Sequence, residues 1–173
     1  MIIVKLEIKI TGVSNLTIRE AVESDNDQIH QLIMDLAEFE KIKDTVEADK
    51  DSTYAALFGN DPSAEAIVAE VDMKIVGTAI FFHNFSTFIG KRGLYLEDIY
   101  VRPEHRGNGI GRSLLSRLAR IAEQRGCGRM EWTVLDWNTK AIDFYDELGG
   151  KILDEWKIVR LDAEGIRKVS HIL

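Results

Sequence analysis

The sequence is poor in cysteine and proline. Its 173 residues include one cysteine, Cys127, and two prolines. A single cysteine cannot form an internal disulfide, and such usage is typical of proteins of a reducing cytosol, so we expect a cytoplasmic protein. No stretch rich in serine, glycine and proline marks a linker between domains. The length is that of one domain with one hydrophobic core.

The sequence also lacks a long hydrophobic segment. Its longest uncharged apolar run lies near Ala79–Phe82, and a membrane span needs roughly 18 residues. The first residues, Met-Ile-Ile-Val-Lys, have neither the basic start nor the cleavage site of a signal peptide. We therefore expect no membrane partner and no signal peptide.

Basic residues are outnumbered, with 22 lysines and arginines against 29 acids and a net charge of −7. Sequence-independent binding of nucleic acid needs a surplus of basic residues, so we expect no nucleic-acid partner. The negative charge fits a cationic small substrate better, although charge alone does not establish one. The four histidines lack the spacing of metal ligands, which predicts no metal site.

Hydrophobic periodicity predicts an α/β (α+β) protein. Alternating residues predict strands over the first ten residues and over Leu16–Ala21, and apolar residues at helical spacing predict a helix that begins after Ser24 or Asp25. The other predicted helices are Asp49–Phe58, Gly109–Arg125 and Thr139–Leu148, and the other predicted strands are Ala66–Val71, Ile75–His83, Leu94–Val101, Arg129–Leu135 and Trp156–Leu161. The segment Asn84–Gly93 is predicted as a loop. This order favours a mixed, mostly antiparallel sheet with helices on both faces.

The most informative segment is Arg106-Gly107-Asn108-Gly109-Ile110-Gly111, which follows a predicted strand and opens a helix. Its alternating glycines remove side chains where the backbone must turn tightly or approach a ligand. The first amides of a helix have no internal partners and lie at the positive end of the helix dipole. The segment therefore predicts a cradle for a pyrophosphate, with a glycine-rich turn that holds no ligand as the alternative.

Two other interpretations of the glycines fit less well. The segment does not end in Gly-Lys-Ser/Thr, so it is not the usual nucleoside-triphosphate loop. A dinucleotide-binding fingerprint expects an early strand–helix–strand unit and an acid at the end of the next strand. Asp136 lies at such an end and keeps the dinucleotide alternative open.

These residues and their surroundings resemble the GNAT N-acetyltransferases. The family's acetyl-CoA motif is similar to Arg106-x-x-Gly109-x-Gly111 preceded by Leu96-Glu97-Asp98-Ile99-Tyr100-Val101. A second block of the family is similar to Leu135-Asp136-Trp137-Asn138, Ala141-Ile142-Asp143-Phe144-Tyr145 and Leu148-Gly149-Gly150. Two further segments resemble the branch of diamine (spermidine/spermine) and thialysine acetyltransferases, namely Leu36-Ala37-x-Phe39-Glu40 and Ile89-Gly90-Lys91. The resemblance implies a GNAT domain over residues 16–173 and an N-terminal extension over residues 1–15.

The resemblance implies acetyl-CoA as the cosubstrate. The backbone amides of Ile99 and Val101 are expected to bind its pantetheine arm as an added strand would. The other residues implied to contact it are Tyr100, Arg106, Gly107, Asn108, Gly109, Ile110, Gly111, Arg112, Asn138 and Tyr145. Solvated side chains are the alternative for the two arginines, and a plain helix cap is the alternative for Asn138.

Acetyl transfer from a thioester to an amine needs a neutral amine, a polarised carbonyl and a proton for the leaving thiolate. A primary amine with a pKa of ~10 is mostly charged at pH 7, and the resemblance assigns the base to Glu97. In a regular strand the adjacent Asp98 points to the opposite face, and we expect its role to be mainly structural. Tyr145 is implied as the acid for the thiolate, with a packing role beside Phe144 as the alternative.

The resemblance implies that the acceptor is a primary amine of a small molecule. Phe39 and Glu40 are implied to bind it, unless Glu40 is only a surface charge. Polyamine-preferring members carry an acid before the Ile-Gly-Lys sequence, where this chain has Ser86 and Thr87. These two residues resemble the thialysine-preferring branch. We therefore expect thialysine or a lysine-like amino acid rather than spermine, with a diamine or polyamine as the wider class.

Two other functions stay open at this point. The cofactor motif also occurs in enzymes that acetylate protein N-termini or lysines, and a non-catalytic acetyl-CoA-binding regulatory module is a further alternative. Glu97, Asn138 and Tyr145 argue against a non-catalytic module. The resemblance also implies a homodimer. Because direct transfer in a ternary complex needs no enzyme thiol, Cys127 is expected to be inert.

Overall fold

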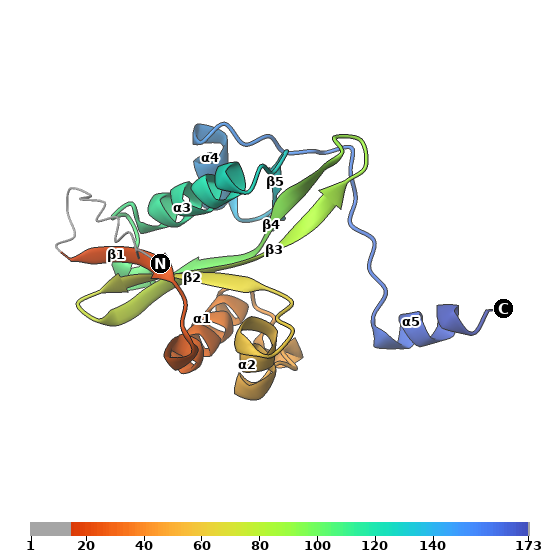
Figure 1. The fold of residues 1–173 in the computed structure, drawn as a ribbon, viewed down its shortest axis with the longest axis horizontal. Helices are drawn as coiled ribbons and strands as arrows, with labels where there is room; N and C mark the ends of the chain where they lie inside the picture. Colours follow the sequence, from red (N-terminus) through yellow and green to blue (C-terminus); the bar gives the residue numbers. More distant parts are fainter. Residues whose placement is uncertain (1–14, 173) are drawn as a thin grey trace. The chain divides into compact units, whose positions relative to one another are not determined.

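The computed structural model describes residues 15–172 (Figure 1). The chain divides into two compact units between Thr133 and Val134, and each unit is described by itself. Unit 1 contains the sheet and the first helices, and unit 2 contains the remaining helices. The strand predicted within the first ten residues, and with it most of the predicted extension, lies outside the described residues.

The described residues of unit 1 form a five-stranded sheet with the order β1-β2-β3-β4-β5. The strands are β1 (Leu16–Glu20), β2 (Glu65–Val71), β3 (Lys74–Ser86), β4 (Lys91–Val101) and β5 (Met130–Glu131). The pairs from β1 to β4 are antiparallel, whereas β4 and β5 are parallel. The predicted mixed, mostly antiparallel sheet is confirmed.

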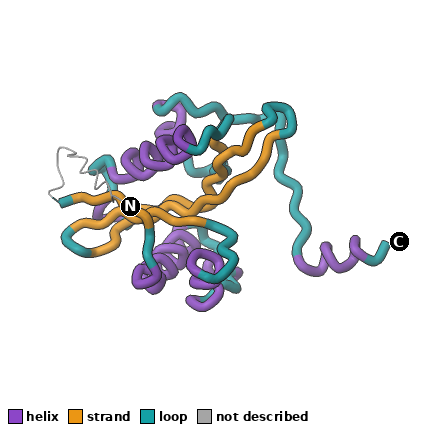
Figure 2. Tube along the Cα trace, in the orientation of Figure 1, coloured by secondary structure: helices purple, strands orange, loops and turns teal. Residues whose placement is uncertain are grey.

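Helices cover both faces of this sheet, as the sequence predicts. The helices α1 (Asn26–Phe39) and α2 (Lys50–Phe58) lie on one face, and α3 (Ile110–Gln124) lies on the other (Figure 1). Figure 2 shows the same layers, with the strands between the helices of unit 1. The glycine-rich turn and the end of α1 therefore belong to elements on opposite faces of one sheet.

The hydrophobic core explains why these helices dock. On the α1 side, Ile29 and Leu32 are fully buried against Ile80 and Tyr100 of the sheet. On the other side, the apolar stripe of α3 is buried at Ile110, Leu114, Leu115, Leu118 and Ile121. Full burial of one such side chain contributes roughly 1.5–3 kcal/mol. The periodicity that predicted these helices is thus the packing pattern that holds them.

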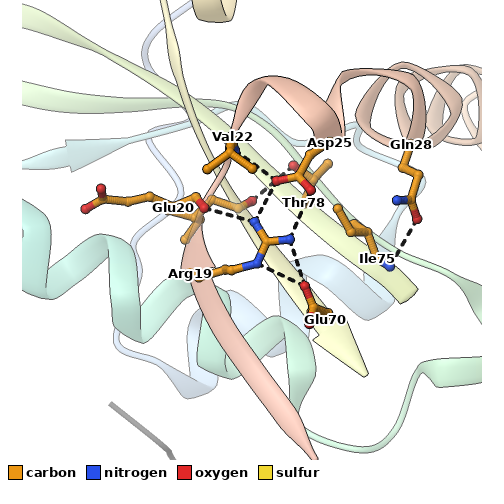
Figure 3. A network of polar contacts seen from close by, with 9 residues as sticks. Arg19, Glu20, Val22, Asp25, Gln28, Glu70, Ile75 and Thr78 are labelled. Atoms are coloured by element: carbon orange, nitrogen blue, oxygen red, sulfur yellow. Dashed lines mark hydrogen bonds and ion pairs between the residues drawn. The ribbon is translucent and has the colours of Figure 1, made fainter. Parts of the chain in front are cut away.

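A polar network fixes the start of α1 against the sheet (Figure 3). Arg19 of β1 forms ion pairs with Asp25 at 2.6 Å and with Glu70 of β2 at 2.7 Å. Asp25 also accepts a hydrogen bond from the Val22 amide. Burial opposes ionisation of Asp25, but the hydrogen bonds from Arg19 and Val22 outweigh it and hold its pKa below the ordinary value. The network joins β1, β2 and the helix start.

The prediction of a loop over Asn84–Gly93 is wrong. β3 and β4 continue as a hairpin to the pair formed by Ser86 and Lys91. The turn closes with the Gly90 amide donating to the Ser86 carbonyl at 2.8 Å, and Gly90 has a φ of +69°. Cross-strand pairing of the polar and aromatic residues stabilises extended backbone there, and the residue types alone did not reveal it.

Strand predictions near the end of the chain are also corrected. The strand predicted over Arg129–Leu135 is shortened to Met130–Glu131, because β5 pairs with β4 only at Leu94 and Tyr95. Trp156–Leu161 does not form the predicted strand, since no neighbouring strand of unit 2 pairs with it among the residues described. Alternating apolar residues favour extension, but a strand also needs a partner.

Unit 2, as far as residue 172, contains two helices, α4 (Thr139–Glu147) and α5 (Ala163–Ser170). The sequence predicted α4 correctly and missed α5. Aspartate is a favoured N-cap residue, so Asp162 was a signal in the sequence for the start of α5. In the structure Asp162 accepts a hydrogen bond from the Gly165 amide at 2.7 Å. Across residues 15–172, no helix is both long enough and apolar enough to cross a membrane.

Candidate functional site

The glycine-rich turn joins β4 to α3. Gly107 and Gly109 have φ values of +77° and +75°, and Gly109 is the N-cap of α3 in the left-handed conformation. A residue with a Cβ would cost roughly 1–2 kcal/mol in this conformation. An added Cβ at Gly107 or Gly111 would meet nothing within 4 Å. The backbone of the turn is therefore uncovered at these positions, which is the geometry that a closely approaching ligand needs.

The start of α3 lies directly after this turn. Its first intrahelical bond is donated by the Ser113 amide to the Gly109 carbonyl at 3.0 Å. The amides of Ile110, Gly111 and Arg112 precede that bond and have no acceptor within the helix. They lie at the positive end of the helix dipole, which favours an anion. The structure thus gives the predicted cradle the local geometry of an anion site.

The end of β4 offers a second set of backbone groups. The Arg102 amide donates to the Val76 carbonyl at 2.9 Å, and Tyr100 lies opposite Thr78. By the alternation of an antiparallel ladder, the amides of Ile99 and Val101 then point away from β3. On that side β5 pairs with β4 only at Leu94 and Tyr95 in the part of the chain that the structure describes. The edge of β4 from Ile99 to Val101 can therefore accept an added strand.

Arg106 opens the glycine turn but folds back onto the protein. Its Nε donates to the Val101 carbonyl at 2.8 Å. Its Cζ lies 5.0 Å from the centre of the Phe39 ring and 5.1 Å from the centre of the Tyr100 ring. The turn also holds Asn108, whose amide donates to the carbonyls of His105 and Arg106. Contact of Arg106 or Asn108 with a phosphate stays a prediction.

A β-bulge separates the two adjacent acids of β4. Asp98 pairs with Ile80 and Leu96 pairs with Phe81, so Glu97 is the extra residue. The regular alternation that would send Glu97 and Asp98 to opposite faces does not apply at this point. Glu97 is exposed, whereas Asp98 is half-buried. We expected a mainly structural role for Asp98. Because of the bulge, Asp98 instead lies where the charges of Glu97 and Glu40 act on it.

Asp98 lies in an acidic environment together with Glu40, which follows the last residue of α1. Burial, and then the charges of Glu97 and Glu40, raise the pKa of Asp98 to about 6. Burial also raises the pKa of Glu40. No side-chain hydrogen bond or ion pair to Asp98 is found within residues 15–172. A cation bound near these acids would relieve their repulsion, so the arrangement favours a positively charged ligand.

Sequence reasoning did not assign Asp98 to the candidate site. A signal was present on one side, because the apolar Tyr100 follows Asp98 by two positions. In a strand such a neighbour indicates a buried face, and an acid on that face needs an explanation. The bulge and the approach of Glu40 could not be read from the chain.

The structure does not bring Ser86 and Thr87 beside Glu97. Ser86 is buried, and its hydroxyl accepts hydrogen bonds from the Ile89 amide and from Arg129. Thr87 is exposed in the hairpin turn. Ser86 pairs with Lys91, which lies six positions before Glu97 on β4. At about 3.3 Å per residue, this is a distance on the order of 20 Å along the strand. The part of Ser86 and Thr87 in substrate binding stays a prediction.

Unit 2 carries the remaining predicted residues. The Asn138 side chain accepts a hydrogen bond from the Ala141 amide at 3.4 Å and caps α4. Tyr145 is buried on the same helix, and burial raises the pKa of its phenol. The phenol therefore keeps its proton at neutral pH. The Phe144 ring lies 5.5 Å from the Tyr145 ring, and the catalytic part of Tyr145 stays a prediction.

Cys127 has a histidine neighbour that the sequence did not reveal. Its Sγ lies 3.8 Å from Nδ1 of His83. That nitrogen donates to the Gly93 carbonyl at 2.9 Å and so already carries a proton. It cannot take the thiol proton in this state. Within residues 15–172, no group of three or more Cys, His, Asp or Glu side chains is arranged to hold a metal ion.

The comparison with known proteins identifies the family. Residues 26–149 match the Acetyltransferase (GNAT) family. The chain belongs to this family. Thialysine N-epsilon-acetyltransferase from Sus scrofa is 38% identical over 168 residues, covering 91% of this chain and 98% of the relative. L-ornithine N5-acetyltransferase from Arabidopsis thaliana is 36% identical over 114 residues, covering 65% of this chain and 50% of the relative.

Solved structures agree with the GNAT fold. An integron cassette protein from V. cholerae has a TM-score of 0.75 at 24% identity, covering 90% of this chain and 98% of that one. A transcriptional regulator from Bacillus halodurans has a TM-score of 0.70 at 26% identity, covering 86% of this chain and 99% of that one.

As a member of the GNAT family the chain is an acetyltransferase. Unit 1 holds both the anion cradle and the acidic cluster of Glu40, Glu97 and Asp98.

Proposed function

We propose that this GNAT acetyltransferase moves the acetyl group of acetyl-CoA to the side-chain amine of thialysine or a lysine-like amino acid, by direct transfer in a ternary complex. One observation carries the proposal. Unit 1 joins an open strand edge and an anion cradle to an unneutralised acid, Asp98, on the same strand. The names of the relatives support the acceptor class, since thialysine and ornithine both carry a primary side-chain amine.

The donor half of the site consists mainly of backbone groups. The amides of Ile99 and Val101 would hold the pantetheine arm as an added strand. The amides at the start of α3 would hold the pyrophosphate, because Gly107 and Gly111 leave the backbone uncovered there. Acetyl-CoA, when bound, supplies the activated acetyl thioester. The protein then positions this group and excludes water from it.

The acceptor half of the site holds the cationic amine and removes a proton from it. Asp98 and Glu40 supply negative charge, and Glu97 supplies an exposed carboxylate next to them. We assign proton removal to the pair of Glu97 and Asp98, directly or through water. Asp98 is the better matched acceptor, because its pKa of about 6 lies closer to the working pH than that of an ordinary carboxyl group.

The leaving thiolate needs a proton, and we assign this step to Tyr145. A phenol donates a proton or a strong hydrogen bond to a departing sulfur. The phenol of Tyr145 is protonated at neutral pH, and burial raises its pKa above the ordinary value. Asn138, at the N-cap of the same helix, uses its Oδ1 for the cap. Its amide nitrogen is the group that we assign to acetyl-CoA.

We also propose a homodimer, as in the acetyltransferase branch that the sequence resembles. Sedimentation of the full chain at micromolar concentration is expected to give a dimer, and a monomer would contradict this part of the proposal.

Thiol release from acetyl-CoA tests the proposed reaction. The panel contains thialysine, lysine, ornithine, spermidine and a lysine-containing peptide, and mass spectrometry locates the acetyl group on each product. We expect turnover on the side-chain amines of the amino acids. Turnover on the peptide alone would indicate a protein acetyltransferase, whereas binding of acetyl-CoA without turnover on any amine would indicate a regulatory module.

A further inference from the structure

Arg106 joins the donor and acceptor halves of the site through three contacts. Its guanidinium lies against the rings of Phe39 and Tyr100, at 5.0 Å and 5.1 Å. Its Nε donates to the carbonyl of Val101. A cation over an aromatic ring and a hydrogen bond from a charged group both favour one placement of the side chain. These contacts commit much of the side chain to the protein itself.

The contacted residues belong to different parts of the site. Phe39 is the last residue of α1 and precedes Glu40, one of the acids that surround Asp98. Tyr100 follows Asp98 by two positions and shares its face of β4. Arg106 itself precedes Gly107, where the turn takes up a positive φ. A displacement of the turn at its first residue would therefore move a group that packs on the end of α1.

We propose that Arg106 is a positioning residue that couples acetyl-CoA binding to amine binding. The proposal rests on the proposed function. Ligand binding to the glycine turn fixes the backbone at Arg106, and the guanidinium then holds Phe39 and the adjacent Glu40 in place for the amine. The coupling is reciprocal, because two ligands that favour the same arrangement each strengthen the binding of the other.

The geometry distinguishes this role from a simple phosphate contact. One edge of the guanidinium is bonded to Val101, and aromatic rings lie close to its carbon. An arginine that turned its Nε toward a phosphate would give up the bond to Val101. As a phosphate ligand, Arg106 would affect CoA binding and its salt dependence. As a positioning residue, Arg106 changes how much bound CoA increases the affinity of the protein for the amine.

Calorimetry on the full chain measures this coupling. Thialysine is titrated into the protein with and without saturating CoA, which cannot react. We expect CoA to tighten thialysine binding about fivefold or more in the wild type. Arg106→Gln is expected to reduce the ratio to about one. Arg117→Gln is the matched control, because Arg117 is an arginine of α3, outside the glycine turn, and among the described residues makes only a 3.5 Å contact with Glu20.

Two further variants keep the test decisive if Arg106→Gln is poorly folded. Arg106→Lys keeps the charge but loses the planar group, and Phe39→Leu removes one ring while leaving Arg106 intact. Both are expected to lower the coupling while CoA itself still binds. A wild type that binds CoA but shows no coupling would overturn the inference, as would variants that keep the wild-type ratio. Failure of the wild type to bind CoA would instead contradict the proposed function on which the inference rests.

Discussion

Asp98 lies opposite Ile80 across β3 and β4, and Glu97 has no partner in the ladder. Ile80 belongs to the core beneath α1, so the pairing places a carboxyl group at the margin of that core. The carboxyl group has no cation among its described neighbours, and the charges of Glu97 and Glu40 act on it in the same direction as burial. A site that favours a cationic ligand follows from this arrangement.

Asp98 should reduce the stability of the free protein at neutral pH. Its pKa rises from an ordinary value of 3.8 to about 6 in the fold, so the folded state binds more protons between these values. The free energy of unfolding falls as the pH rises through that window, by at most about 3 kcal/mol. Asp98→Asn is therefore expected to stabilise the protein by about 1–3 kcal/mol at pH 8 and to have little effect below pH 4.

Denaturant unfolding of wild type, Asp98→Asn and the exposed-site control Asp61→Asn checks this prediction. A loss of stability in Asp98→Asn at pH 8 would contradict it.

The Asp98→Asn variant should also bind the amine poorly. In the wild type the KM for the amine should rise as the pH falls through about 6, whereas the amine, with a pKa of ~10, keeps its charge there. In Asp98→Asn the KM should be high at every pH of this window.

Gly111→Ala should change stability and affinity in opposite directions. Alanine favours the first turn of α3 by about 0.5–1 kcal/mol over glycine, and its Cβ would meet nothing within 4 Å. The same Cβ would project from the turn where the pyrophosphate is proposed to bind. We expect a higher melting temperature and CoA binding weakened about tenfold or more, which is 1.4 kcal/mol or more.

Thermal denaturation and calorimetry give both quantities for Gly111→Ala. Ser116→Ala, at an exposed position of the same helix, is expected to leave CoA binding unchanged. If Gly111→Ala bound CoA as tightly as the wild type, the ligand would not approach the backbone at this turn.

Tyr145→Phe should lower turnover while acetyl-CoA binding persists. The substitution removes only the phenolic oxygen, and a general acid contributes about a hundredfold or more to such a step. We expect kcat to fall by this order with little change in the dissociation constant of CoA. Tyr54→Phe is the matched control, since the Tyr54 hydroxyl is exposed and bonds to Glu23. Equal kcat values for Tyr145→Phe and the wild type would remove the phenol from the mechanism.

The sequence predicted those features that depend on local pattern. The apolar stripe of α3 and the hydrophobic spacing of α1 gave both helices nearly to the residue. The glycine turn was likewise readable, because Gly109 requires a backbone conformation that other residues adopt at a cost. The fold class followed from the order of these elements.

Features that depend on distant pairing were predicted less well. The short β5 is set by partners in β4 that lie far away in the sequence, and the extent of the hairpin through Ser86 and Lys91 is set by cross-strand pairing that the residue types do not reveal. The bulge at Glu97 is of the same kind, and it decides which acid lies near Glu40. The anchoring of Arg106 between Phe39 and Tyr100 joins three elements, and no spacing within the chain predicts it.

The central claim is that the chain acetylates the side-chain amine of a lysine-like amino acid. Its most direct test is kcat/KM for thialysine with acetyl-CoA, measured at pH 8 by thiol release and compared with spermine on the same preparation. We predict turnover on thialysine, with a larger kcat/KM than on spermine. Absence of turnover on thialysine, in a protein that binds acetyl-CoA, would contradict the account.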